Sequence, residues 1–328
     1  MNTSPSDSPY LAAVSDVAAA TTPTPTHSAA PRSGSLRSFV SRHPVGSFLI
    51  VAYVIFWTSW MPVLFLGASP RIFSAIGAVL GLALPAFLVA AATEGRSGVR
   101  DLVRRTLRWR VGIGWYLLAS LGLLTATLLV ASAFPGVAPF QALAQKWSLF
   151  FTMFLPGILI PLVITHLFEE AGWTGFMQDT LQKRRGPLLA SILVAPAFVL
   201  FHLPLSFLEA PRITLAVVQL ALVQLAVQAI VVVFFRVGIM WLYNVTGRSV
   251  LIVALFHSSF NSAGTGSEYA RRFIEELIAG PAVLLIPMVV VAVLAVLVAV
   301  LTRGRLGYEP KRAAPRPASE PPVIQPAS

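Results

Sequence analysis

Residues 148–170 read SLFFTMFLPGILIPLVITHLFEE, an apolar run without Lys, Arg or Asp that ends in a pair of glutamates. A membrane-spanning helix needs roughly 20 consecutive and mostly apolar residues, so this run is long enough to cross a bilayer. Ionisable side chains are costly within the bilayer, and a glutamate pair in such a run therefore indicates a functional site. This one stretch predicts both a membrane helix and the place of the protein's chemistry.

The whole chain has the composition of a polytopic membrane protein. Of its 328 residues, 56% are hydrophobic and only 11% are charged, whereas soluble domains carry roughly 25% charged residues. Because helices satisfy their own backbone hydrogen bonds in lipid, we expect an all-α membrane bundle. About eight spans are predicted, at 47–66, 72–93, 113–134, 148–170, 187–207, 213–245, 249–263 and 281–301.

The two ends of the chain differ from this apolar middle. Residues 1–45 and 304–328 are rich in Ser, Pro and Ala and read as disordered cytoplasmic tails, which leaves 46–303 as the transmembrane domain. The chain has no cysteine. Disulfides, thiolate metal sites and a cysteine nucleophile are therefore excluded.

Basic residues predict the orientation in the membrane. With eight spans, 18 of the 24 Lys and Arg residues fall in the proposed inner segments and five fall in the outer loops. This bias predicts that both termini are cytoplasmic, in a multi-pass protein of the cell (plasma) membrane. The basic residues are scattered between apolar blocks, which argues against nucleic-acid binding. The remaining one, Arg236, is expected to extend from its long span to the inner interface.

Polar residues on three predicted helices fall at a similar depth. At 1.5 Å per residue, Glu169, His202 and Asn261 each lie roughly 20 Å from the inner surface, and His257 roughly 14 Å. His257 and Asn261 share one helix face, because they are four residues apart. We therefore expect the four side chains to line one cavity inside the bundle.

The neighbouring polar residues are expected to support this set. Glu169 and Glu170 are about 100° apart around a helix, so one should face the cavity. The other should form a supporting bond, to Thr174 or to His166. For His166 itself, the interpretation is a structural residue or a partner of Glu170.

These residue types suit the hydrolysis of an amide bond. A carboxylate inside a protected cavity can act as a general base, and a histidine beside it can help to hold a water molecule. A second histidine and an amide can donate hydrogen bonds to the oxyanion of a tetrahedral intermediate.

Three short motifs carry a family resemblance. EEAGWTGF begins at Glu169, FVLFH runs from Phe198 to His202, and HSSFN runs from His257 to Asn261. In this order on membrane helices, they resemble the CPBP family of CAAX proteases and bacteriocin-processing proteins, over about residues 148–263. The sequence departs from the family's Glu-Glu-x-x-x-Arg pattern at Thr174, which cannot form the bidentate ion pair of an arginine.

The resemblance implies an intramembrane peptidase over residues 46–303 that cleaves a peptide or lipidated-protein substrate at the membrane. It implies Glu169 as the general base, His202 as a water-positioning residue, His257 and Asn261 as the oxyanion hole, and Glu170 as a supporting residue. The family is often described as metalloproteases, so a zinc ion held by Glu169, His202 and His257 is the alternative to metal-free water activation.

Two functions of other classes remain open at this stage. Titratable groups within a helical bundle also suit a proton-coupled transporter, although no duplicated half with broken helices is visible. A non-catalytic protein that gives self-immunity to a secreted bacteriocin is the other alternative, and Thr174 adds weight to it.

Overall fold

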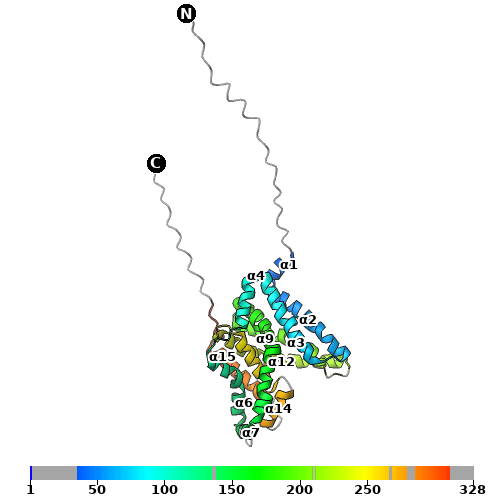
Figure 1. Cartoon of the computed structure of the whole chain (residues 1–328), viewed down its shortest axis with the longest axis vertical. Coiled ribbons are helices and arrows are strands. Elements are labelled where there is room, and N and C mark those ends of the chain that lie inside the picture. The colour runs from blue at the N-terminus through cyan, green and yellow to red at the C-terminus, as the bar shows by residue number, and fades with distance from the viewer. Residues whose placement is uncertain are drawn as a thin grey trace.

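The structure, a computed structural model, describes residues 1, 35–134, 138–208, 210, 212–265, 268–278 and 285–310. Every regular element in this part of the chain is a helix, which confirms the predicted all-α class. Figure 1 shows α2 (Pro44–Leu66) and α3 (Pro70–Ala78) at one edge of the bundle, with α6 (Leu123–Ala131) and α15 (Leu285–Leu301) at the other. The predictions for residues 2–34 and 311–328 lie outside the described residues.

Five helices of the described chain are long and apolar enough to cross a membrane. They are Pro44–Leu66, Ala75–Thr106, Ile113–Ala131, Phe150–Arg185 and Leu215–Val245, the last being α12. Three shorter apolar helices are Pro187–Phe201, which is α11, Val250–Ala263, which begins with α13 (Val250–Phe260), and Leu285–Leu301. Each predicted span therefore contains an apolar helix, and the number of crossings, eight, stays a prediction.

The remaining helical elements are parts of the long helices or lie between them. Ala75–Thr106 contains the π-helical η1 (Val79–Ala83) and α4 (Leu84–Thr106), and Ile113–Ala131 contains α5 (Ile113–Leu117) and η2 (Leu118–Gly122). Short elements are α7 (Pro139–Gln145), the 3₁₀ turn η6 (Leu203–Phe207), η7 (Asn261–Thr265) and α14 (Glu268–Leu277).

Both tail boundaries are corrected by the structure. Within 1–45, residues Ser35–Arg42 form helix α1 rather than a disordered segment, and α2 begins at Pro44. Within 304–328, Leu306 is fully buried, and its carbonyl accepts a hydrogen bond from Asn244 Nδ2 at 3.0 Å. Composition alone did not predict these contacts, because a few apolar residues are enough to anchor a Ser- and Pro-rich segment to the bundle.

Two apolar clusters form the core, and α12 contributes to both. One cluster gathers side chains of α6, α12, α13 and α15. The other gathers side chains of α2, α4, α11 and the segment after Glu170, with Val232 of α12. Phe235 belongs to the first cluster and Phe198 to the second. Both rings lie within about 6 Å of the His257 ring, so the polar site occupies the boundary between the clusters.

The helix Phe150–Arg185 is built from alternating α and π turns. It comprises η3 (Phe150–Phe154), α8 (Leu155–Pro161), η4 (Leu162–His166), α9 (Leu167–Glu170), η5 (Ala171–Gln178) and α10 (Asp179–Arg185). The fourth helix therefore continues beyond the glutamates to the basic residues at its end.

The two glutamates lie in a single α turn between two π-helical segments. π-Helical segments are rare and frequently mark functional sites. Gly172 lets η5 approach η1, since a Cβ there would lie 3.0 Å from the carbonyl oxygen of Leu82. This close approach sets the position of the glutamate-bearing turn against its neighbours.

Candidate active site

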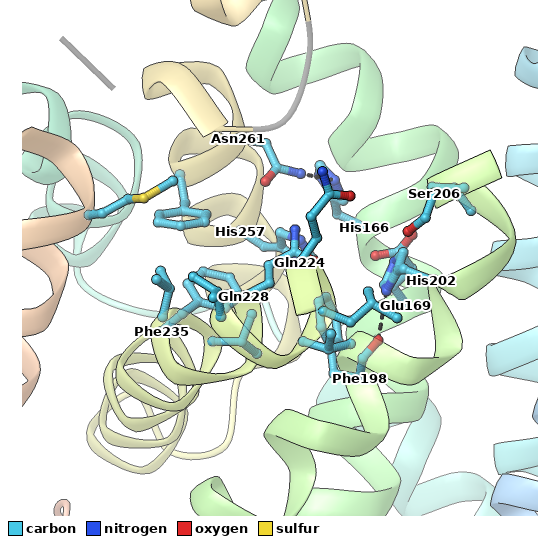
Figure 2. A pocket seen from close by; sticks show the side chains of 18 of the residues that line it. His166, Glu169, Phe198, His202, Ser206, Gln224, Gln228, Phe235, His257 and Asn261 are labelled. Atoms are coloured by element: carbon cyan, nitrogen blue, oxygen red, sulfur yellow. Dashed lines mark hydrogen bonds between the residues drawn. The ribbon is translucent and has the colours of Figure 1, made fainter. Parts of the chain in front are cut away.

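A cavity of about 800 Å³ opens among α9, α11, α12 and α13. Its lining includes Glu169, His202, His257 and Asn261, so residues from all three sequence motifs meet there. Figure 2 shows these side chains around one hollow, with Glu169 close to His202. The four residues thus lie together, as their shared depth in the sequence predicts.

The adjacent glutamates have different surroundings. Glu169 is partly buried and lines the cavity, whereas Glu170 is fully buried behind it. As expected from their angular separation, one carboxylate faces the cavity and the other forms supporting bonds. The carboxylate available to a water molecule is that of Glu169.

Glu170 is bound by three side chains from three different parts of the chain. Its carboxylate accepts a hydrogen bond from the Thr174 hydroxyl, as the sequence predicted for one of the glutamates. His257 Nδ1 donates to Oε1 at 2.9 Å. Arg236 donates from Nη1 to Oε2 at 3.0 Å and from Nη2 to Oε1 at 3.2 Å. The carboxylate is therefore fixed, and it in turn orients the His257 ring.

The prediction that Arg236 extends to the inner interface is wrong. Its side chain is fully buried, and its guanidinium lies 4.3 Å from the centroid of the Phe198 ring. A buried arginine needs an anionic partner, and Glu170 provides one at bidentate geometry. Snorkelling was expected because sequence cannot reveal a carboxylate 66 positions away.

Arg236 also accounts for the departure from the family pattern at Thr174. Its Nη1 lies 3.2 Å from the Thr174 hydroxyl. The small threonine side chain leaves room for a guanidinium that enters from α12. The positive charge missing from position 174 is thus supplied to the same carboxylate by another helix.

His202 and His257 each have one ring nitrogen fixed by the protein. His202 Nδ1 donates to the carbonyl oxygen of Phe198 at 2.7 Å, and His257 Nδ1 donates to Glu170. Such bonds fix the tautomer and the ring orientation. In each ring, Nε2 is then left for chemistry in the cavity.

His166 lines the cavity as part of the site, although its sequence position indicated only a supporting role. Its ring stacks on that of His257, with centroids 4.2 Å apart. Its Nδ1 pairs with the Ser258 hydroxyl at 2.6 Å, and its Nε2 with Asn261 Nδ2 at 3.0 Å. The spacing of three residues between His166 and Glu169 places both on one helix face and was the signal that could have revealed it.

One group of histidine and acidic residues has the composition of a metal site. It consists of His166, Glu169 and His257, whose ligand atoms lie within 4.8 Å of one another. His202, named in the predicted zinc set, is not in this group. Both nitrogens of His166 are already hydrogen-bonded to Ser258 and Asn261, so no lone pair of this ring is left for a metal. In this arrangement the three residues do not fit a zinc ion.

Two glutamines of α12 were not recognised from the sequence as site residues. Gln224 and Gln228 line the cavity from α12, and both are exposed. In Figure 2 the Gln224 side chain reaches across the hollow toward His166 and Asn261. Two amides at i and i+4 in an apolar helix were the available signal.

Residues 151–263 match the family of type II CAAX prenyl endopeptidase Rce1-like proteins. The matched segment begins in η3, ends in η7 and contains all three sequence motifs. No curated protein matches the chain. The segment that forms the cavity's polar wall is therefore similar to the Rce1-like CAAX endopeptidases, in agreement with the resemblance that the three motifs carry.

Proposed function

We propose that this protein is an intramembrane endopeptidase that hydrolyses a peptide bond in a membrane-associated substrate. One observation carries the proposal: Glu169, His202, His257 and Asn261 line a single cavity within the helical bundle. Titratable groups at such a place are costly to maintain and indicate function. The substrate is a peptide or a lipidated protein, and the prenyl group in the family's description makes a prenylated chain the first candidate.

Water activation is assigned to Glu169 and His202. Glu169 faces the cavity, and its carboxylate accepts a proton from a water molecule that His202 Nε2 helps to position. The resulting hydroxide attacks the carbonyl carbon of the substrate, and Glu169 then passes the proton to the departing amine. Substrate plus one water equals the two products, so no further reactant is needed.

The tetrahedral oxyanion is assigned to His257 and Asn261. Donation from His257 Nε2 to the oxyanion uses the imidazolium form of the ring, in which Nδ1 stays bonded to the Glu170 carboxylate. Asn261 Nδ2 has two hydrogens, and only one is needed for His166. The second is free to donate toward the substrate, from an amide that His166 holds in place.

We favour metal-free activation over zinc. A zinc ion bound by His166, Glu169 and His257 would require Asn261 to release His166 Nε2. Such a release would also free the Asn261 amide from its orientation. The mechanism derived above uses only side chains that are already oriented for it.

We propose the following placement of the site in the membrane. Membrane lipid surrounds the apolar helices, and both termini lie on the cytoplasmic side of the plasma membrane. The helical bundle, which begins with α2 at Pro44 and packs as far as Leu306, is the peptidase domain. Substrate enters the cavity from the lipid or from the cytoplasmic side.

The direct test is cleavage of defined peptides by the purified protein in lipid nanodiscs. A farnesylated peptide with a C-terminal CAAX sequence and its unprenylated form are compared, and the products are identified by mass spectrometry. We expect two fragments whose masses sum to the substrate plus one water, with the Glu169→Gln variant folded but inactive. Full cleavage by that variant would remove Glu169 as the base.

A further inference from the structure

We propose that Gln224 and Gln228 bind the main chain of the substrate, which lies as an extended strand along α12. This inference rests on the proposed peptidase function and identifies how its substrate is held. It assigns a role to the wall of the cavity that α12 contributes, which the mechanism above does not use.

The two glutamines carry polar side chains in an apolar helix. Both are exposed, and neither side-chain amide forms a hydrogen bond with any residue that the structure describes. Unsatisfied amides within a bilayer cost several kcal/mol each unless water or a ligand satisfies them. Both line the cavity, so a bound ligand with donors and acceptors can satisfy them there.

Their spacing fits a peptide strand. Residues four apart on a helix are separated by about 6 Å along its axis. In an extended chain, backbone groups that point to the same side recur every second residue, about 6.6 to 6.8 Å. A primary amide carries both a donor and an acceptor. Gln224 and Gln228 can therefore each pair with the N–H and C=O groups of alternate substrate residues.

The rest of this face of α12 is apolar and suits substrate side chains. Val227, Val231 and Phe235 line the same cavity beside the glutamines. Phe235 also meets the His257 ring edge to face, at 5.1 Å between centroids. A strand that follows the glutamines toward Phe235 is thus led to the catalytic wall.

Recognition of this kind depends on the backbone of the substrate rather than on its sequence. Main-chain bonds to an added strand give affinity, whereas side-chain pockets give specificity. We therefore expect the two amides to contribute to substrate binding at positions where many side chains are tolerated. Loss of one uncharged hydrogen bond should weaken binding about 3- to 10-fold.

The test measures binding separately from cleavage. A farnesylated CAAX peptide with a fluorescent label is titrated against the Glu169→Gln protein in nanodiscs, followed by anisotropy. The background then receives Gln224→Met or Gln228→Met, which keeps the side-chain length but removes the amide. Gln219→Met is the matched control, because Gln219 is exposed on α12 but does not line the cavity.

A series of peptides with one backbone N-methyl group at each position completes the design. We expect two methylated positions, two residues apart, to weaken binding about 3- to 10-fold. Gln224→Met should weaken binding of the unmethylated peptide by the same factor, and methylation at one of these two positions should then weaken binding no further. Gln228→Met should behave in the same way for the other position. Gln219→Met should leave the whole series unchanged.

Equal binding of all methylated peptides would overturn the proposal, and so would equal effects of Gln219→Met and the two cavity variants. Absence of measurable peptide binding to the Glu169→Gln protein would overturn it as well. If the binding pattern is found but the unsubstituted protein cleaves no peptide, the proposed hydrolysis fails while the binding assignment stands.

Discussion

The guanidinium of Arg236 and the carboxylate of Glu170 form a bidentate ion pair in which both side chains are fully buried. Glu170 also accepts from His257 Nδ1 at 2.9 Å, so the pair controls the orientation of a ring in the candidate active site. Removal of one partner of a buried ion pair strongly destabilises the folded protein, because the remaining charge is left uncompensated. Arg236 is accordingly a positioning residue that acts through Glu170 and His257.

Replacement of Arg236 by Met should therefore impair both stability and catalysis. Breaking a buried ion pair from one side costs about 3 to 5 kcal/mol, which thermal unfolding in detergent would detect. Misplacement of His257 should lower kcat on the order of 100-fold in the protein that remains folded. Arg236→Lys should restore only part of both, because lysine lacks the bidentate fork. Unchanged kcat in Arg236→Met would contradict the positioning role.

Moving the arginine to position 174 should rescue this loss. Thr174 Oγ1 already bonds to Glu170 and lies 3.2 Å from Arg236 Nη1, so a guanidinium from position 174 can fill the vacated space. We expect Thr174→Arg with Arg236→Met to regain more than half of the lost thermal stability and kcat. Thr174→Arg alone should destabilise the protein, since two guanidinium groups would then compete for one carboxylate. A double variant no better than Arg236→Met would show that the two positions are not equivalent.

A second buried carboxylate should matter for stability but not for chemistry. Asp179 is 3% exposed at its side chain and pairs with Lys183 and Arg248, both at 2.8 Å, and with Arg105 at 3.3 Å. Asp179→Asn should lower stability by roughly 3 kcal/mol and leave KM and kcat of the folded protein unchanged. Asp101→Asn is the control, because Asp101 is 28% exposed and its pairs are screened by solvent. Equal losses of stability in the two variants would argue against a special role for Asp179.

Metal content separates the two modes of water activation. If water is activated without a metal, elemental analysis should find less than about 0.1 zinc per chain, a level on the order of background binding. Treatment with a chelator should then leave cleavage unchanged. His166→Gln should then lower kcat by about 10-fold, because Asn261 loses its hydrogen-bond partner. One zinc per chain that disappears in His166→Gln would instead establish His166 as a ligand.

The predicted orientation is testable because the chain contains no cysteine. Two exposed residues can each be replaced by a single cysteine: Arg184 near the end of α10, and Ser148 just before η3. With cytoplasmic termini, a membrane-impermeant maleimide should label Ser148→Cys in intact cells and Arg184→Cys only after permeabilisation. The opposite labelling pattern would show that the bundle is inserted in the opposite orientation.

The membrane class and the three motifs were readable from sequence because they depend on local patterns. Apolar runs long enough for spans, and pairs at i,i+4 such as His257 and Asn261, need no knowledge of other helices. The adjacency of Glu169 and Glu170 likewise showed that they face different surroundings. Adjacency alone did not show which of the two lines the cavity; Glu169 was named by the family resemblance, and the packing of the neighbouring helices decides it.

The sequence by itself determined that this protein is a bundle of apolar helices with carboxylate, imidazole and amide groups at a shared depth. Only the tertiary structure decided which groups touch: Arg236 on Glu170, His166 on His257 and Asn261, and Gln224 with Gln228 across the cavity. The physical reason is that helical periodicity fixes a residue's height and face, whereas a contact between helices depends on how distant segments pack. A buried charge cannot remain unpaired in lipid, but the partner that satisfies it can come from any helix of the bundle.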